Sequence, residues 1–265
     1  MPAMTAADGV EIVYDTWGEP SPEPPVILHH GFIADGNLNW VLPGVVRALE
    51  AAGRRAVVLD ARGHGRSGKP HDPALYGEAT MARDVASLAD AVGADRYDLV
   101  GYSMGAIVSL ITATRDPRIR RLVVGGVGAG VAELGGVDTR VVDNRALVAA
   151  LDADDPGAIT DPAAAGFRQF ADAVGGDRRA LAAQARRVHA EAIPLDRIAA
   201  PTLIIAGRED LLAARPEVLA AAIPGARVAP VSGDHMGAMA DPDFARLIVD
   251  FLARSVTFGG RGQPS

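Results

Sequence analysis

The sequence predicts an α/β fold, in which a mostly parallel, twisted sheet carries helices on both faces and a small helical cap interrupts the chain. Short apolar runs bounded by Gly, Pro or charged residues alternate with longer segments of helical periodicity. Residues 131–194 break this alternation with helical patterns alone. The chain has 265 residues, of which 49% are hydrophobic, which suits a single α/β domain with an insertion.

Six apolar runs of five or six residues are the expected strands: 26–30, 56–60, 97–101, 121–125, 202–207 and 227–231. The segments between the first of them repeat apolar side chains at intervals typical of helices, at 39–52, 78–92 and 104–115. Strands joined by helices run parallel, and their C-terminal ends meet at one edge of the sheet. We therefore expect the reactive groups at that edge.

The chain divides into a predicted core, residues 1–130 and 195–254, and a predicted cap, residues 131–194. Three helical patterns follow one another in the cap, at 139–151, 162–174 and 178–192. An amphipathic helix is expected at 241–254, and the glycine-containing segment 255–265 is expected to be a flexible tail.

Composition excludes several classes of function. The net charge is −7, so no positive field favours nucleic acid as a partner. The chain has no cysteine, which excludes disulfides, thiolate metal sites and cysteine nucleophiles. The longest uncharged run, residues 99–114, is shorter than a membrane helix, and residues 1–16 lack the pattern of a secretory signal. We expect no membrane partner and a cytoplasmic location.

Ser103 is the candidate nucleophile. It lies in Gly101-Tyr102-Ser103-Met104-Gly105, between an expected strand and an expected helix. A serine on such a turn is lifted above the sheet, and the flanking glycines relieve the crowding of the turn. Because a serine hydroxyl is a weak nucleophile, it needs a nearby base.

His235 and Asp210 are the candidate partners of Ser103. His235 follows the last expected strand, at the same edge of the sheet as Ser103, and would act as the base. Asp210 follows strand 202–207 and would orient the imidazole. Glu209 is the alternative acid, since it is adjacent, and an N-cap is the alternative role for Asp210.

The backbone N–H groups of Phe32 and Met104 are the candidate oxyanion hole. Phe32 follows the strand at 26–30, and Met104 follows the nucleophile. The adjacent His29 and His30 could instead indicate a metal site, but neighbouring residues of a strand point to opposite sides. We therefore expect no metal and no cofactor.

These motifs resemble the α/β-hydrolase family over nearly the whole chain. The matching patterns, in order, are His30-Gly31-Phe32, Asp60-x-Arg62-Gly63-His64-Gly65-x-Ser67, Gly101-Tyr102-Ser103-Met104-Gly105, Gly207-x-x-Asp210 and Gly233-Asp234-His235. The resemblance implies that fold, a helical cap after the sixth strand, and catalysis by Ser103, Asp210 and His235. Within this family, the serine at position 103 excludes the relatives that use an aspartate nucleophile, such as haloalkane dehalogenases.

One glycine pattern, residues 63–68, satisfies the dinucleotide motif GxGxxG but precedes Lys69-Pro70-His71-Asp72-Pro73. The prolines block the helix whose N-terminus would bind a pyrophosphate, so we interpret the segment as a structural turn.

The predicted function is hydrolysis of small carboxylic esters through an acyl-enzyme. Lactonase, thioesterase, carbon–carbon bond hydrolase, acyltransferase and cofactor-free perhydrolase activities would use the same groups. A receptor that closes its lid over a ligand is the alternative from another class. The candidate substrate contacts are apolar: Ile33, Leu211, Met236, Phe167 and Phe170. Simple packing within the cap is the alternative role of the two phenylalanines.

Overall fold

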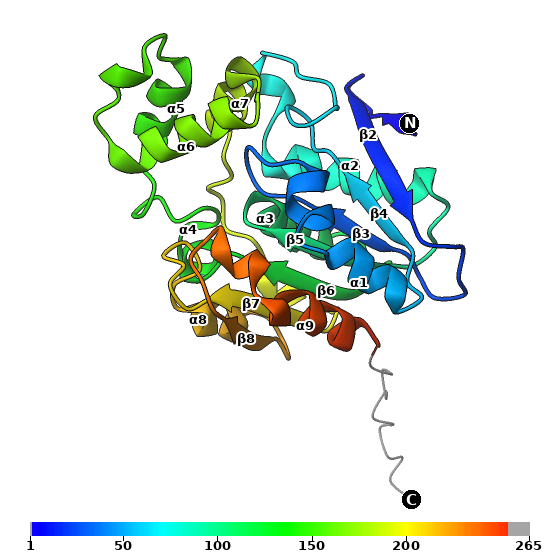
Figure 1. The fold of residues 1–265 in the computed structure, drawn as a ribbon. Coiled ribbons are helices and arrows are strands. Elements are labelled where there is room, and N and C mark those ends of the chain that lie inside the picture. The colour runs from blue at the N-terminus through cyan, green and yellow to red at the C-terminus, as the bar shows by residue number, and fades with distance from the viewer. Residues whose placement is uncertain (1, 254–265) are drawn as a thin grey trace, which may run out of the picture.

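The computed structural model describes residues 2–253. Its centre is a sheet in the order β1-β2-β4-β3-β5-β6-β7-β8 (Figure 1). From β4 to β8 every neighbouring pair is parallel, whereas β2 pairs antiparallel with β1 and with β4. The strands are β1 (Ala3–Thr5), β2 (Glu11–Trp17), β3 (Val26–His29), β4 (Ala56–Leu59), β5 (Tyr97–Tyr102), β6 (Ile119–Gly125), β7 (Thr202–Gly207) and β8 (Arg227–Val231). The predicted fold class is confirmed.

The two faces of the sheet carry separate apolar cores. On one face the core includes side chains of α2 (Glu78–Ala91), α3 (Met104–Ala113) and α8 (Pro216–Ala222). On the other it includes α1 (Val45–Ala51) and α9 (Pro242–Ala253). Helices on both faces bury the central strands, which explains why β3 and β4 are apolar except for the buried His29 at the end of β3.

Some expected elements have different bounds. The expected helix at 39–52 is divided into a π-helical segment, Asn37–Val41, and α1, because Gly44 between them has a φ of 85°. The short helices α4 (Ala129–Leu134) and α8 and the strands β1 and β2 were not expected. Glu11 and Asp15 interrupt the apolar pattern of β2, which lies between the short strand β1 and β4.

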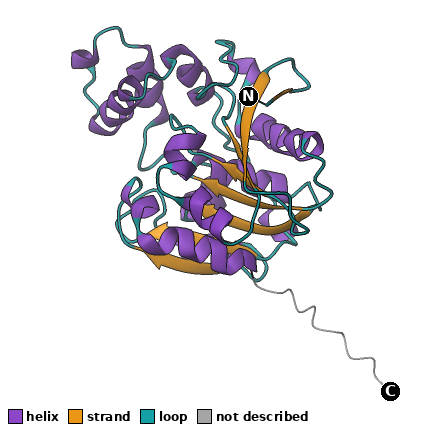
Figure 2. Cartoon of the chain, turned by 45° about the vertical axis from the view of Figure 1, so that its right-hand side comes forward, coloured by secondary structure: helices purple, strands orange, loops and turns teal. Residues whose placement is uncertain are grey.

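Three helices from residues 131–194 gather on one side of the molecule, apart from the sheet (Figures 1 and 2). They are α5 (Asn144–Asp152), α6 (Pro162–Ala173) and α7 (Arg178–Ala185), and the side chains of Asp143, Asp161 and Asp177 cap their N-termini. Their buried apolar side chains form a cluster that includes Leu147, Leu151 and Leu181. Treating residues 131–194 as a separate cap stays a prediction.

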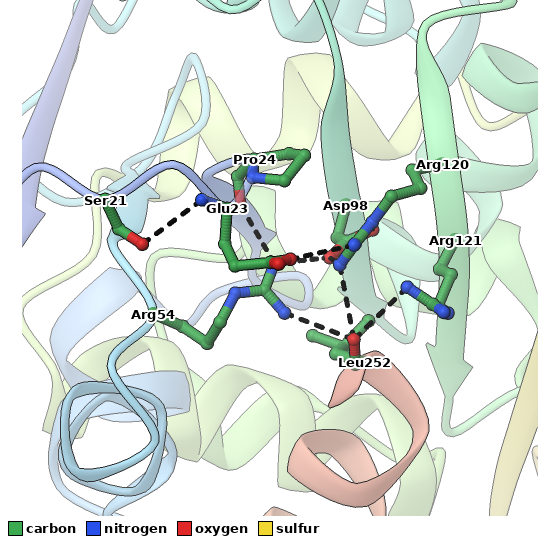
Figure 3. A network of polar contacts seen from close by, with 8 residues as sticks. All are labelled: Ser21, Glu23, Pro24, Arg54, Asp98, Arg120, Arg121 and Leu252. Carbon is green, nitrogen blue, oxygen red and sulfur yellow. Dashed lines mark hydrogen bonds and ion pairs between the residues drawn. The ribbon is translucent and has the colours of Figure 1, made fainter. Parts of the chain in front are cut away.

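An arginine network contacts the C-terminal end of α9 (Figure 3). Asp98 and Arg120 lie near the starts of β5 and β6, at the edge of the sheet opposite Ser103. Arg54, Arg120 and Arg121 each donate to the Leu252 carbonyl oxygen, at 3.2–3.3 Å. Arg54 and Arg120 also pair with the fully buried carboxylate of Asp98, at 2.5 and 2.6 Å. Cations at a helix C-terminus complement its dipole, so the network stabilises the end of α9.

The remaining sequence expectations concern the chain ends and the membrane. The expected tail, residues 255–265, and residue 254 of the last expected helix lie outside the described residues. No helix within residues 2–253 is both long and apolar enough to cross a membrane.

Candidate active site

Ser103 lies on a sharp turn between β5 and α3, with a φ of 54° and a ψ of −116°. This backbone conformation is strained for a residue other than glycine. The neighbouring glycines are required by close approach: a Cβ on Gly101 would lie 2.2 Å from the Gly105 carbonyl oxygen. A Cβ on Gly105 would lie 2.1 Å from the His29 carbonyl oxygen. Chain packing therefore imposes the turn.

The side chains of Ser103, His235 and Asp210 form one hydrogen-bonded chain. His235 Nε2 lies 2.9 Å from Ser103 Oγ, and His235 Nδ1 lies 2.8 Å from Asp210 Oδ2. The other oxygen of Asp210 accepts from the Leu212 N–H at 2.9 Å. Asp210 is buried, whereas the His235 side chain is partly exposed. An imidazole protonated on Nδ1 can accept the serine proton at Nε2, which is the geometry of general-base catalysis.

Two further groups position the loop that carries His235. The Tyr102 hydroxyl donates to the His235 carbonyl oxygen at 2.6 Å. Burial, and then the nearby Asp210 carboxylate, raises the pKa of Tyr102, so its hydroxyl stays protonated. Glu209, the alternative acid, accepts instead from the Gly233 N–H at 2.6 Å. Tyr102 occupies a variable position of the serine motif, so the sequence carried no signal for this role.

The expected oxyanion-hole residues lie beside Ser103. Phe32 and Met104 both line a cavity with it. The backbone comes close there, because a Cβ on Gly31 would lie 3.3 Å from Ser103 Cβ. The Gly31 N–H donates to Asn39 Oδ1 at 2.7 Å, which fixes the loop that presents Phe32. Asn39 is a second positioning residue that no motif indicated.

Three hollows surround Ser103 and His235. The inner chamber, about 50 Å³, is lined by Phe32, Ser103, Met104 and Phe167 together with the polar residues Glu78, Asn144 and Gln184. The middle hollow, about 130 Å³, is lined by Phe32, Ser103, Phe167, Phe170, His235 and Met236, among others. The outer hollow, about 480 Å³, is lined by Phe167, Phe170, Asp210, Leu211, His235 and Met236, among others.

The candidate substrate contacts are distributed unevenly over these hollows. Phe167 lines all three, and Phe170 and Met236 line two. Leu211 lines only the outer hollow, where it is 70% exposed. Ile33 lines none of these three hollows; it is 4% exposed and packs with the cluster of α5–α7. A larger hollow of about 690 Å³ lies at the opposite edge of the sheet, around the arginine network.

His29, His30 and His64 form a buried group beside the expected oxyanion loop. The ring centroids of His29 and His30 lie 5.7 Å apart, and those of His30 and His64 lie 5.2 Å apart. Because β3 ends at His29, His30 no longer follows the alternation of a strand. Each Nδ1 donates to a backbone carbonyl oxygen, so each ring is protonated there. Burial lowers the pKa of His29 and His30 to about 4 and that of His64 to about 3.

The described part of the chain contains no group of side chains that would support the metal interpretation of His29 and His30. Within residues 2–253 no three His, Asp or Glu side chains are placed to hold a metal ion together.

The pattern at 63–68, considered above for a dinucleotide, is a series of turns that starts no helix. The nearest following helical element is a single 3₁₀ turn, Pro73–Leu75.

Glu78 is the buried acid of the inner chamber. It is the first residue of α2 and is only 3% exposed. Its Oε2 accepts from the His189 N–H at 2.7 Å, and burial raises its pKa to about 7. This contact also explains why α7 ends at Ala185 and not at residue 192, since the chain turns away to reach α2. An acid in the first turn is favoured by the helix dipole alone, so the sequence did not indicate its burial.

Comparison with known proteins bears on the fold of the chain. The model of the "alpha/beta hydrolase fold" family matches residues 24–129. A "sn-1-specific diacylglycerol lipase ABHD11" of Danio rerio is 34% identical over 124 residues, which are 46% of this chain and 37% of the relative. A "2-hydroxy-6-oxo-2,4-heptadienoate hydrolase" of Pseudomonas putida is 36% identical over 141 residues, 51% of this chain and 48% of the relative. The chain therefore spans less than half the length of these curated relatives.

Solved structures match along almost the entire chain. A hydrolase from Pseudomonas aeruginosa has a TM-score of 0.75 and 28% identity, over 96% of this chain and 98% of that one. The enol-lactonase from Burkholderia xenovorans has a TM-score of 0.78 and 26% identity, over 96% of this chain and 100% of that one. With the motif order, the sheet and the serine turn, these matches show that the chain has the alpha/beta hydrolase fold.

Proposed function

We propose that the protein is a serine hydrolase that cleaves small carboxylic esters through an acyl-enzyme. The observation that carries this proposal is the hydrogen-bonded chain from Ser103 Oγ through His235 to Asp210, at 2.9 and 2.8 Å. Such a chain generates an alkoxide nucleophile without a metal or cofactor. The hollows around it offer space for both parts of an ester.

In the first half of the reaction, Ser103 Oγ attacks the ester carbonyl carbon, and its proton passes to His235 Nε2. Asp210 stabilises the resulting imidazolium through its bond to Nδ1–H. The negative charge that develops on the carbonyl oxygen is placed at the N–H groups of Phe32 and Met104. When the intermediate collapses, the bond to the leaving oxygen breaks and His235 donates its proton to that oxygen.

In the second half, His235 removes a proton from water, and the hydroxide attacks the acyl carbon of the ester with Ser103. Collapse of this intermediate releases the carboxylic acid and returns the proton to Ser103 Oγ. One ester and one water give one acid and one alcohol. We propose that residues 131–194 act as the lid of this site, since Phe167 and Phe170 of α6 line the hollows.

A lactone is the second candidate substrate. The observation that favours it is the likeness to the enol-lactonase over 96% of this chain. A lactone is a cyclic ester, so the same steps would open its ring and leave acid and alcohol in one molecule. The carbon–carbon bond hydrolase among the relatives matches only about half of this chain, 51%, and supports that activity less directly.

The test is a Ser103→Ala variant assayed with short p-nitrophenyl esters and with a fluorophosphonate, which labels activated serines. The variant should lose labelling and lower kcat by ~10⁴ to 10⁶ because it removes the nucleophile. Wild-type binding of a small ligand without turnover would favour the receptor alternative. Labelling of the variant would refute Ser103 as the nucleophile.

A further inference from the structure

The inner chamber is placed to receive the acyl part of a substrate. In the proposed mechanism His235 must protonate the leaving oxygen, so the leaving group lies on the His235 side of Ser103. His235 lines the middle and outer hollows. The inner chamber includes Ser103 and Met104 in its lining but not His235, so it lies on the other side of the reacting carbon.

The size of this chamber limits the acyl group. At about 50 Å³ it is the smallest of the three hollows around Ser103. A single water needs roughly 10 to 15 Å³ on this measure, so the chamber holds only a few atoms beyond the carbonyl carbon. The apolar part of its lining includes Ile107 of α3 and Leu147 of α5.

The polar side chains of the chamber lining offer hydrogen-bond acceptors. Glu78 supplies a buried carboxyl group, and the Oε2 atom of that group accepts from the His189 N–H at 2.7 Å. Asn144 also lines the chamber, and its Nδ2–H donates to the Ala185 carbonyl oxygen at 2.9 Å. The other polar atom of this side chain, Oδ1, is an acceptor. Gln184 already uses its oxygen to accept from the Gly77 N–H at 3.1 Å. No Lys or Arg is among the described residues that line the chamber.

We propose that the inner chamber selects short acyl groups that end in a hydrogen-bond donor, an ammonium or a hydroxyl, received by Glu78 and Asn144. This inference rests on the proposed ester hydrolysis, and it specifies the acyl half of the substrate. The Glu78 carboxyl accepts from the backbone N–H groups of His189 and of Glu78 itself. A plain alkyl end would add no further hydrogen bond to this buried group, whereas a donor end would add one. An anionic end would meet a carboxyl group with no cation beside it.

The test compares p-nitrophenyl esters that differ only at the end of the acyl chain. Glycyl and glycolyl esters replace the terminal methyl of the propionyl ester by an ammonium or a hydroxyl. β-Alanyl and butyryl esters are the same comparison one carbon longer, and a malonyl monoester supplies the anion. After subtraction of uncatalysed hydrolysis, wild-type kcat/KM for at least one donor ester should exceed that of its methyl counterpart by about tenfold.

Glu78→Gln separates recognition from a structural role, because glutamine keeps an acceptor for the His189 N–H. The variant should lower kcat/KM for the preferred ammonium ester about tenfold more than for its methyl-ended counterpart. If the hydroxyl ester is the preferred one, the glutamine should retain much of that preference. The control is Glu50→Gln, an exposed acid on α1, which should change none of these ratios.

Equal loss on every ester in Glu78→Gln would show a structural role and overturn the inference. So would a wild-type preference for the methyl-ended esters, a comparison that needs no variant to fold. In both cases hydrolysis of alkyl esters that depends on Ser103 would leave the proposed function standing. Absence of turnover on all esters, with no fluorophosphonate labelling, would instead refute the proposed function.

Discussion

Asp210 and Glu209 are adjacent in the chain but contact different partners. Asp210 bonds to the His235 ring, whereas Glu209 bonds to the Gly233 backbone. Asp210→Asn should keep the shape but favour the wrong imidazole tautomer, and kcat on a short ester should fall by ~10² to 10⁴. Glu209→Gln keeps an acceptor for the Gly233 N–H and should cost far less. If steady-state kinetics rank the two variants in the opposite order, Glu209 orients the imidazole.

Single residues differ in how far the sequence could indicate them. Ser103, Asp210 and His235 each follow an apolar run that ends at the same edge of the sheet, so order along the chain brings them together. Tyr102, Asn39 and Glu78 depend on contacts between distant segments. No local pattern reports such contacts, so these residues could only be found in the folded structure.

The turn between β5 and α3 requires glycine at Gly105. A methyl group there would lie 2.1 Å from the His29 carbonyl oxygen, and backbone atoms cannot move aside as a flexible side chain can. We expect Gly105→Ala to lower the free energy of unfolding by at least about 2 kcal/mol, measured by urea denaturation. Gly166→Ala is the matched control, since a methyl group in this part of α6 meets nothing within 4 Å. It should raise helix stability by about 0.5 to 1 kcal/mol. Equal effects of the two substitutions would contradict this account of the turn.

Strands were easier to predict than helix boundaries. The central strands are buried on both faces, so they appear in the sequence as nearly continuous apolar runs. Helix ends depend on caps and on contacts elsewhere: Asp143 begins α5, and the contact of His189 with Glu78 ends the helical run after α7. The strand β2 was missed because the exposed Glu11 and the half-buried Asp15 interrupt its apolar pattern, and charges are common near a sheet edge.

Stability of the whole molecule should depend on pH through its buried histidines. Their pKa values fall from the ordinary 6.5 to about 4 or below, so the unfolded chain binds protons below pH 6.5 that the folded protein does not. Stability is therefore lost as pH falls from 6.5 towards 4. Glu78 acts in the opposite direction, because its raised pKa of about 7 favours the folded protein at low pH.

The destabilising effect of the three histidines at low pH exceeds the stabilising effect of Glu78. The free energy of unfolding should therefore be lower at pH 5 than at pH 7, by on the order of 3 kcal/mol. Urea denaturation at the two pH values measures this difference. His64→Gln should reduce the difference by roughly half, because one ring contributes about 2 kcal/mol to a net difference that Glu78 has already lowered. Equal stability of the wild-type protein at pH 5 and pH 7 would show that these rings are protonated in the folded protein.

The overall architecture followed from the sequence, while the shape of the substrate space did not. Alternation of strands and helices limits an α/β chain to few topologies. The three hollows depend on how α5–α7 pack over Ser103, and the same helical pattern would allow several packings. The candidate substrate contacts expected from the sequence were all apolar, whereas the lining of the inner chamber also includes the buried Glu78.

The central claim is that Ser103 carries the acyl group between two half-reactions. The most direct measurement is rapid-mixing release of p-nitrophenol from a short acyl ester, combined with mass spectrometry of the acid-quenched protein. If deacylation is the slower half, we expect a burst of about one p-nitrophenol per protein and an acyl adduct on the peptide that contains Ser103, both absent in Ser103→Ala. Turnover without any adduct on Ser103 under these conditions, or an adduct on another residue, would contradict the account.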